Sequence, residues 1–178
     1  MSLVEEKFRS LIDSVHHGDL AKFKDELNKV PDWQLQHCRY AKSQDTLVML
    51  ICKLGRVEFL QVLLDKLTSD EIEYLFNLSN NDGKTPLHEA AQFSQPQTIS
   101  FLLDHNVKVD PIKRADWTPL HLACTKTGRN AVDAVQILLD HGADCLLENK
   151  VWFGSQCEIL HQTWSFLSNF SQKFTRIK

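Results

Sequence analysis

One short motif that occurs twice constrains the fold of this chain more than any other feature. Residues 82–91 read DGKTPLHEAA and residues 115–124 read ADWTPLHLAC, so the Thr-Pro-Leu-His tetrapeptide recurs after 33 positions. Each copy is followed by a segment that ends in Leu-Leu-Asp-His, at 101–105 and at 137–141. A period between about 20 and 50 residues is typical of a chain that stacks one supersecondary unit repeatedly.

Each motif carries the chemistry of a helix start. Pro86 and Pro119 suit the first turn of a helix, where the missing N–H costs no hydrogen bond and the fixed φ favours the helix. Thr85 and Thr118 precede these prolines and are suited to cap the helix with their hydroxyl oxygens. We therefore expect a helix to begin at each proline.

The residues in front of the motifs favour a tight hairpin turn. Gly83 adopts a positive φ without steric penalty, and Asp116, which takes its place in the next copy, tolerates that region better than most residues. The second copy also carries three extra residues near 127–133, which we expect in the turn between its two helices.

The pattern T-P-L-H-x-A followed by L-L-x-x-G-A at this period resembles the ankyrin-repeat family. The resemblance covers about residues 8–147 and is strongest over 81–147. It implies an all-α fold, an ankyrin-repeat solenoid in which helix-turn-helix repeats alternate with short β-hairpin loops. Since one repeat cannot bury its own apolar face, about three or more are needed for a stable stack.

Weaker copies of the pattern divide the rest of the chain. Residues 45–55 (DTLVMLICKLG) keep the threonine and the apolar spacing but lose the proline and the histidine, and an apolar helix pair precedes them. The predicted divisions are an N-terminal cap at about 1–37, a weak repeat at about 41–67, an insert at about 68–80, repeats at 81–112 and 113–147, and a divergent tail at 148–178.

The tail at 148–178 does not continue the repeat. It is rich in aromatic residues, and its apolar side chains follow helical spacing from Leu160 to Ile177. Three interpretations stay open. The tail is a capping helix that covers the last repeat, a disordered segment at the truncated or alternatively spliced end of a longer ankyrin protein, or a helix that docks on a membrane or on a partner, as in a membrane-peripheral adaptor.

Charge and composition exclude several classes of function. The net charge of −3 provides no broad positive field for direct binding of nucleic acid. The longest apolar run, residues 47–52, is far shorter than the roughly 20 residues that span a bilayer, so we expect no integral membrane segment. The five cysteines form no CxxC pair, which favours a reduced environment. We expect a monomer in the cytoplasm and also in the nucleus.

The chain carries no nucleotide-binding, protease or kinase motif. His88 and His121 belong to the repeated tetrapeptide, where we expect hydrogen bonds between neighbouring repeats rather than metal ligation. The sequence therefore predicts a protein that is not an enzyme and that uses no cofactor and no metal ion.

Function is then expected on the concave face that hairpin tips and first helices form in such a stack. Trp117 is the main candidate because tryptophan is enriched at interface hot spots, and Phe93 would complete a two-aromatic anchor. A rim of Lys84, Lys113 and Arg114 favours an acidic partner segment. The predicted partner-binding residues are Lys84, Glu89, Gln92, Phe93, Lys113, Arg114, Asp116, Trp117, Leu122, Thr125 and Lys126.

Within the family, residues 113–120 (KRADWTPL) and 146–150 (LLENK) resemble a member that acts as a cofactor of alanyl-tRNA synthetase. This resemblance implies a non-enzymatic adaptor whose protein partner is that synthetase. The member continues with further repeats where this chain has its tail. The alternative is therefore a truncated product with little function of its own.

Overall fold

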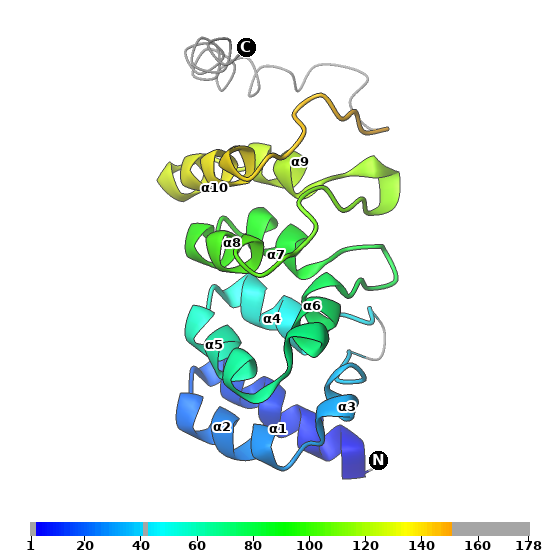
Figure 1. The fold of residues 1–178 in the computed structure, drawn as a ribbon, viewed down its shortest axis with the longest axis vertical. Coiled ribbons are helices and arrows are strands. Elements are labelled where there is room, and N and C mark those ends of the chain that lie inside the picture. The colour runs from blue at the N-terminus through cyan, green and yellow to red at the C-terminus, as the bar shows by residue number, and fades with distance from the viewer. Residues whose placement is uncertain (1–2, 41–42, 151–178) are drawn as a thin grey trace.

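The computed structural model describes residues 3–40 and 43–150 and stacks helix pairs one above another (Figure 1). The elements are α1 (Leu3–His17), α2 (Leu20–Asn28), α3 (Asp32–Leu35), α4 (Leu47–Leu54), α5 (Val57–Lys66), α6 (Ser69–Asn77), α7 (Pro86–Gln92), α8 (Pro96–Leu103), the 3-10 turn η1 (Arg114–Asp116), α9 (Pro119–Cys124) and α10 (Arg129–Asp140).

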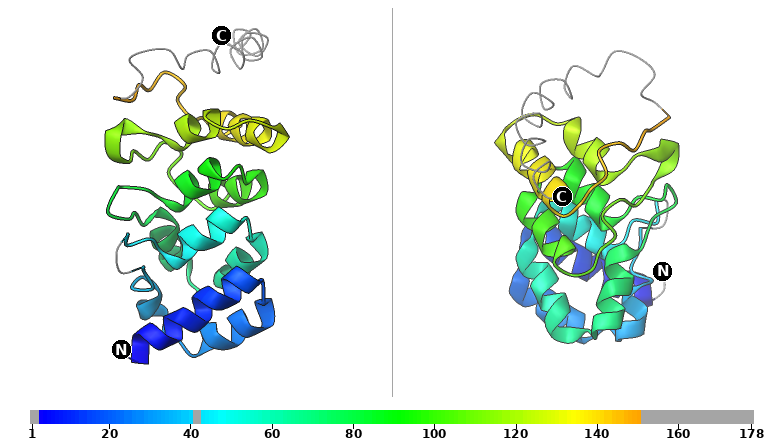
Figure 2. Two further views of the ribbon diagram at one scale, coloured as in Figure 1. Left: turned by 180° about the vertical axis from the view of Figure 1, so that it is seen from behind. Right: turned by 45° about the horizontal axis from the view of Figure 1, so that its top comes forward.

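Two rows of helices run along the stack. The inner row is α1, α4, α7 and α9, each in contact with the next, and the outer row is α2, α5, α8 and α10. The loops that precede the inner helices project to one side of both rows, as the views of Figure 2 show. Within the described residues these loops form isolated β-bridges, Arg39 with Thr46 and Lys113 with Trp117, and no sheet. The predicted all-α solenoid of helix-turn-helix repeats is confirmed.

The hydrophobic core lies between the two rows and runs through every repeat. Phe23 of α2 packs edge-on against Phe59 of α5 at 4.8 Å between ring centroids, which joins the first helix pair to the second. Ala90, Ala91 and Ala123 are fully buried, and their small side chains let successive inner helices approach closely. The core is therefore continuous along the stack rather than divided between separate repeats.

The segment at 68–80, expected as an insert, contains the additional helix α6. The Thr68 N–H donates to Glu71 Oε2 at 2.9 Å and the Glu71 N–H donates to Thr68 Oγ1 at 3.5 Å, which is the pattern of a capping box. The apolar face of α6 buries Leu75 and Phe76 against the stack. The insert therefore contributes to the core.

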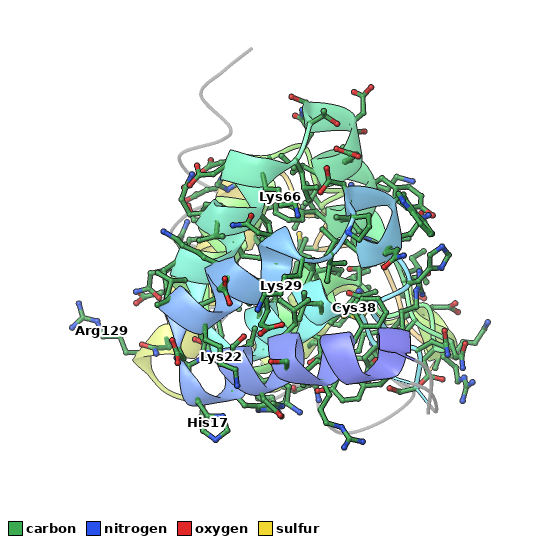
Figure 3. All side chains as sticks on the ribbon, turned by 90° about the horizontal axis from the view of Figure 1, so that it is seen from below. His17, Lys22, Lys29, Cys38, Lys66 and Arg129 are labelled. Atoms are coloured by element: carbon green, nitrogen blue, oxygen red, sulfur yellow. The ribbon has the colours of Figure 1, made fainter. Side chains whose placement is uncertain are left out.

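Lys66 ties the first helix pair to the second at the bottom of the stack. Its Nζ donates to the carbonyl oxygens of Leu27 and Val30 at 2.6 and 2.9 Å, and it lies 3.2 Å from Asp32 Oδ1. The carbonyls at the end of a helix lack partners within it, so this lysine satisfies the C-terminal end of α2. Figure 3 shows Lys66 from below, beside the helices of the first pair.

The expected position of the extra residues near 127–133 is wrong in part. The turn between α9 and α10 covers only residues 125–128, and α10 begins at Arg129. The extra length falls mainly into α10, which has 12 residues against 8 in α8. Ala131 and Ala134 are buried at helical spacing, so the helix gains more by burying them than a longer loop would.

Candidate functional site

The loops that precede the inner helices are hydrogen-bonded to one another from repeat to repeat. We call residues 36–40 and 43–46, 78–85, 111–118 and 144–150 the finger loops. The N–H of Asn81 donates to the carbonyl of Ser43 at 3.4 Å, that of Arg114 to Asp82 at 2.8 Å, and that of Lys150 to Ala115 at 3.1 Å.

Ion pairs reinforce two of these steps. Arg114 lies 2.8 Å from Asp82, and Lys150 lies 2.9 Å from Asp116. Lys150, which makes the second of these ion pairs, lies three residues past the predicted end of the repeat stack at residue 147. The finger loops and helices α4, α7 and α9 therefore form one continuous surface, which we call the inner face.

The tip of the third finger loop needs two residues in the left-handed region. Gly83 has φ +75° in its loop, whereas in the next loop Ala115 and Asp116 have φ +65° and +61°. The sequence pattern assigned this role to Asp116 and did not identify Ala115. The carbonyl oxygen of Ala115 accepts the N–H of Lys150. The residue with the positive φ is therefore also the one that bonds to the next finger loop.

His88 and His121 connect each inner helix to the following finger loop. The N–H of Thr85 donates to His88 Nδ1 at 3.2 Å, so the proton of the neutral ring lies on Nε2 and is donated to the Trp117 carbonyl at 3.0 Å. His121 repeats the arrangement with the Leu147 carbonyl at 2.9 Å. The predicted hydrogen bonds between repeats are confirmed. Burial lowers the pKa of His88 to about 4, so the ring is neutral at pH 7.

The predicted binding residues differ widely in exposure. The exposed residues are Phe93, Arg114, Thr125 and Lys126; partly buried are Lys84, Gln92, Lys113, Asp116 and Trp117; buried are Glu89 and Leu122. Of the exposed residues, Arg114 lies in a finger loop, and Phe93, Thr125 and Lys126 lie in the turns that follow α7 and α9.

The prediction that Glu89 and Leu122 are available on the surface is wrong. Leu122 belongs to the hydrophobic core, and Glu89 is 6% exposed with its Oε1 2.8 Å from Lys84 Nζ. Helix α7 lies between α4 and α9, and α9 packs against both α7 and α10, so each exposes a narrower strip than an isolated helix would.

The predicted basic rim is neutralised within the protein. Lys84 pairs with Glu89, and Arg114 pairs with Asp82. Lys113 Nζ lies 5.7 Å from the centroid of the Trp117 ring, and burial lowers the pKa of that lysine. The rim therefore offers less free positive charge to an acidic partner than the sequence suggested.

The predicted two-aromatic anchor is not assembled. Trp117 is half-buried, packs on the core and meets the His121 ring edge-on at 6.1 Å between centroids. Phe93 follows the last residue of α7 and has Lys53 Nζ 5.0 Å from its centroid. Because the Trp117 carbonyl contacts His88 in the first turn of α7, the two aromatic residues lie at opposite ends of that helix. Phe93, at 42% exposure, is the more accessible of the two.

A cavity of about 280 Å³ on the inner face was not foreseen from the sequence. Its lining residues come from the first two helix pairs and from α7: His16, Tyr40, Ser43, Asp45, Met49, Leu50, Lys53 and Glu89. Met49, Leu50 and Lys53 lie in the weak repeat and Glu89 lies in the first strong one, whereas His16, Tyr40 and Ser43 lie outside any copy of the motif. The repeat pattern indicates positions along single helices and does not show that these positions enclose a cavity.

In residues 3–40 and 43–150, no three His, Cys, Asp or Glu side chains gather in a way that would hold a metal ion. The same part of the chain contains no helix long and apolar enough to cross a bilayer. The three interpretations of the tail fall on residues 151–178, outside the described residues.

Stacked helix pairs with hydrogen-bonded loops along one side define a helical repeat protein of the solenoid class. The profile described as ankyrin repeats (three copies) matches residues 11–111 and 69–149. The chain belongs to the ankyrin-repeat family, a family of protein–protein interaction modules of a non-enzymatic type.

Curated relatives from distant organisms share the repeats. The chain is 30% identical over 94 residues to ankyrin repeat protein nuc-2 of Neurospora crassa, which is 53% of this chain and 8% of that protein. It is 31% identical over 107 residues to SMC5-SMC6 complex localization factor protein 1 of Homo sapiens, 60% of this chain and 9% of that protein. It is 30% identical over 100 residues to B-cell lymphoma 3 protein homolog of Mus musculus, 56% of this chain and 21% of that protein. The chain thus spans about a fifth of their length at most.

Proposed function

We propose that this chain is an adaptor that holds a protein partner on its inner face. The observation that carries the proposal is the continuity of that face. Three steps of backbone hydrogen bonds join the finger loops, so the loops present a preformed surface to a partner. A preformed surface binds with less loss of conformational entropy than a set of independent loops.

The exposed residues at the edge of the inner face, in the turns that follow α7 and α9, are the expected contact points. Phe93 offers an accessible aromatic ring, and Thr125 and Lys126 offer polar groups at the end of α9. Trp117 is a weaker candidate because its ring is half-buried and its carbonyl already accepts a hydrogen bond from His88. We retain Lys113, Asp116 and the rest of the predicted residues that are not buried as the surroundings of these contacts.

We propose alanyl-tRNA synthetase as the partner to test first. The support is the resemblance of residues 113–120 and 146–150 to ankyrin repeat domain-containing protein 16. Action as a monomer in the cytoplasm or nucleus is part of the same proposal. The location is supported by the thiols of Cys38, Cys52 and Cys124, which are buried and form no disulfide in the structure, as in a reducing compartment.

Titration of the fluorescently labelled full chain with purified alanyl-tRNA synthetase tests both parts of the proposal. We expect saturable binding that Phe93→Ala weakens by about tenfold, the loss typical of a hot-spot residue. Gln61→Ala on the outer helix α5 serves as the control, because Gln61 is exposed away from the inner face. Absence of binding at micromolar concentrations would reject the synthetase. Equal loss in the Gln61→Ala variant would reject the inner face as the binding surface.

A further inference from the structure

We propose that the cavity on the inner face receives the side chain of an arginine from the partner protein. This inference rests on the proposed function, since it names the chemistry by which the inner face recognises its partner. The cavity lies where the end of α1, the finger loop before α4, helix α4 and helix α7 meet. Its volume of about 280 Å³ far exceeds the ~15 Å³ that a single water molecule requires.

Glu89 supplies the acceptor at which a guanidinium group would bind. The residue is 6% exposed, and its Oε1 lies 2.8 Å from Lys84 Nζ. Its Oε2 is fully buried and has no hydrogen-bond donor among the described residues. This oxygen is closed to water in the structure, so a guanidinium N–H reaches it from the cavity by a small shift of the side chains that line it. Because a buried carboxylate oxygen without a donor costs free energy, a donor that reaches it gains more there than at an exposed carboxylate.

Asp45 adds a second carboxylate to the same cavity. Ser43 Oγ donates to its Oδ2 at 2.7 Å and Asn80 Nδ2 donates to its Oδ1 at 2.5 Å, which fixes the orientation of the group. Each carboxylate oxygen can accept more than one hydrogen bond, so Asp45 keeps capacity for a further donor. Two oriented carboxylates in one cavity suit a cation that carries several donors.

The remaining lining distinguishes arginine from a small cation. Met49 and Leu50 form an apolar wall, which suits the methylene stem of a long side chain. The hydroxyl of Tyr40, 3.4 Å from His16 Nε2, adds a polar group that accepts as well as donates. A guanidinium group has five N–H donors in a plane and is less strongly hydrated than an ammonium group. It can therefore reach several acceptors at a lower cost of desolvation than lysine can.

The positive charge of Lys53 opposes the binding of an arginine. Removing it therefore tests whether the cavity prefers a cation or an anion. The Lys53 side chain lines the cavity and is exposed, and its Nζ lies 5.0 Å from the Phe93 ring centroid. An arginine in the cavity is repelled by this ammonium group. Replacing Lys53 with methionine, which keeps the stem and removes the charge, is therefore expected to strengthen the binding of arginine and to weaken that of an acidic probe.

The probe is the blocked tripeptide acetyl-Gly-Arg-Gly-amide, followed by amide NMR of the full chain. A contact of this size is expected to bind with a dissociation constant on the order of 1–10 mM. Arginine should shift the amide signals of Asp45, Lys53 and Glu89. The citrulline analogue, which has the same shape without charge, should bind at least about fivefold more weakly, and the lysine analogue should fall between them.

Three variants complete the experiment. Glu89→Gln keeps the shape of the side chain and should weaken arginine binding at least about fivefold, whereas Lys53→Met should strengthen it. Glu58→Gln, the same substitution at an exposed position on α5, is the matched control and should change nothing. Equal affinity for arginine and citrulline, or tighter binding of the glutamate analogue, overturns the proposal, as does an unchanged affinity in both cavity variants.

The tripeptide experiment and the partner titration can fail independently, so the arginine site and the adaptor function can be refuted separately. The tripeptides contain no partner protein, so their binding does not depend on whether the synthetase binds. If Phe93→Ala weakens partner binding while Glu89→Gln leaves it unchanged, the inner face stands and the arginine site is refuted. If the tripeptide binds as expected and no partner engages the inner face, the adaptor function is refuted instead.

Discussion

Lowering the pH from 7 to 5 is expected to destabilise the stack through His88. The ring is buried, and its pKa falls from the ordinary 6.5 to about 4 because burial disfavours the charged form. Its Nδ1 also accepts the Thr85 N–H, which a protonated ring cannot do. At a pH between these two pKa values the unfolded chain binds a proton at His88 and the folded chain does not. The contribution of His88 to the free energy of unfolding is therefore fully present above pH 6.5 and is lost as the pH falls toward 4.

The size of the effect follows from this difference in proton binding. The excess of protons on the unfolded chain rises from about one half at pH 6.5 to nearly one at pH 5, and a full proton is worth about 1.36 kcal/mol per pH unit. The contribution of His88 between pH 7 and pH 5 is therefore about 2 kcal/mol, which is a large part of the stability of a small domain.

Urea denaturation of the full chain at pH 7 and pH 5, followed by circular dichroism, measures this loss. The control is His88→Gln, which changes the stability at both pH values by a similar amount but removes the titrating group. The wild-type chain should lose about 2 kcal/mol more than the variant on acidification. Equal losses in the two chains would show that His88 is not responsible. A proton titration of the ring by NMR provides a second check, and a pKa near 6.5 would refute the reasoning.

Three further predictions concern the packing of the stack. Leu87→Ala leaves a cavity at a fully buried position and should cost about 2–5 kcal/mol in urea denaturation, and a loss below about 1 kcal/mol would mean that the core relaxes around the site. Gly83→Ala should lower Tm more than Gly142→Ala. Both residues have positive φ, but only the Cβ added at Gly83 would lie close to the next finger loop, 3.2 Å from the Cα of Lys113. Equal shifts in Tm would contradict this reasoning. Lys84→Met should destabilise the chain by about 3–5 kcal/mol, since it leaves the Glu89 charge buried without its cation. The double variant Lys84→Met with Glu89→Leu should recover much of that loss in thermal denaturation, and a double variant less stable than the single one would argue against a buried charge as the cause.

Local sequence chemistry was sufficient to predict where the strong repeats begin. The helices α7 and α9 start at Pro86 and Pro119, each with the preceding threonine as its N-cap. The histidine that follows bonds to the next loop in both repeats, as expected from its recurrence. These features depend on residues within a few positions of one another, so a short motif contains nearly all the information needed.

Exposure on the inner face was predicted less well. Glu89 and Leu122 stand at positions of the motif that suggested a surface, yet both are buried. Phe93 and Trp117 are near each other in the pattern but lie at opposite ends of α7. Burial and proximity depend on how closely the neighbouring repeats approach, and the spacing of residues within one repeat does not contain that distance.

The sequence by itself determined the family, the repeat period and the residues that start each inner helix, because these follow from backbone geometry and hydrogen bonding over short distances. Only the tertiary structure decided which charges remain free and where a cavity forms. Lys84 became the partner of Glu89, and that carboxylate was brought beside Asp45 from another repeat, 44 positions earlier in the chain. Residues that are distant in sequence come together in this way because one repeat packs on the next, and burial there strengthens the electrostatic interactions between them.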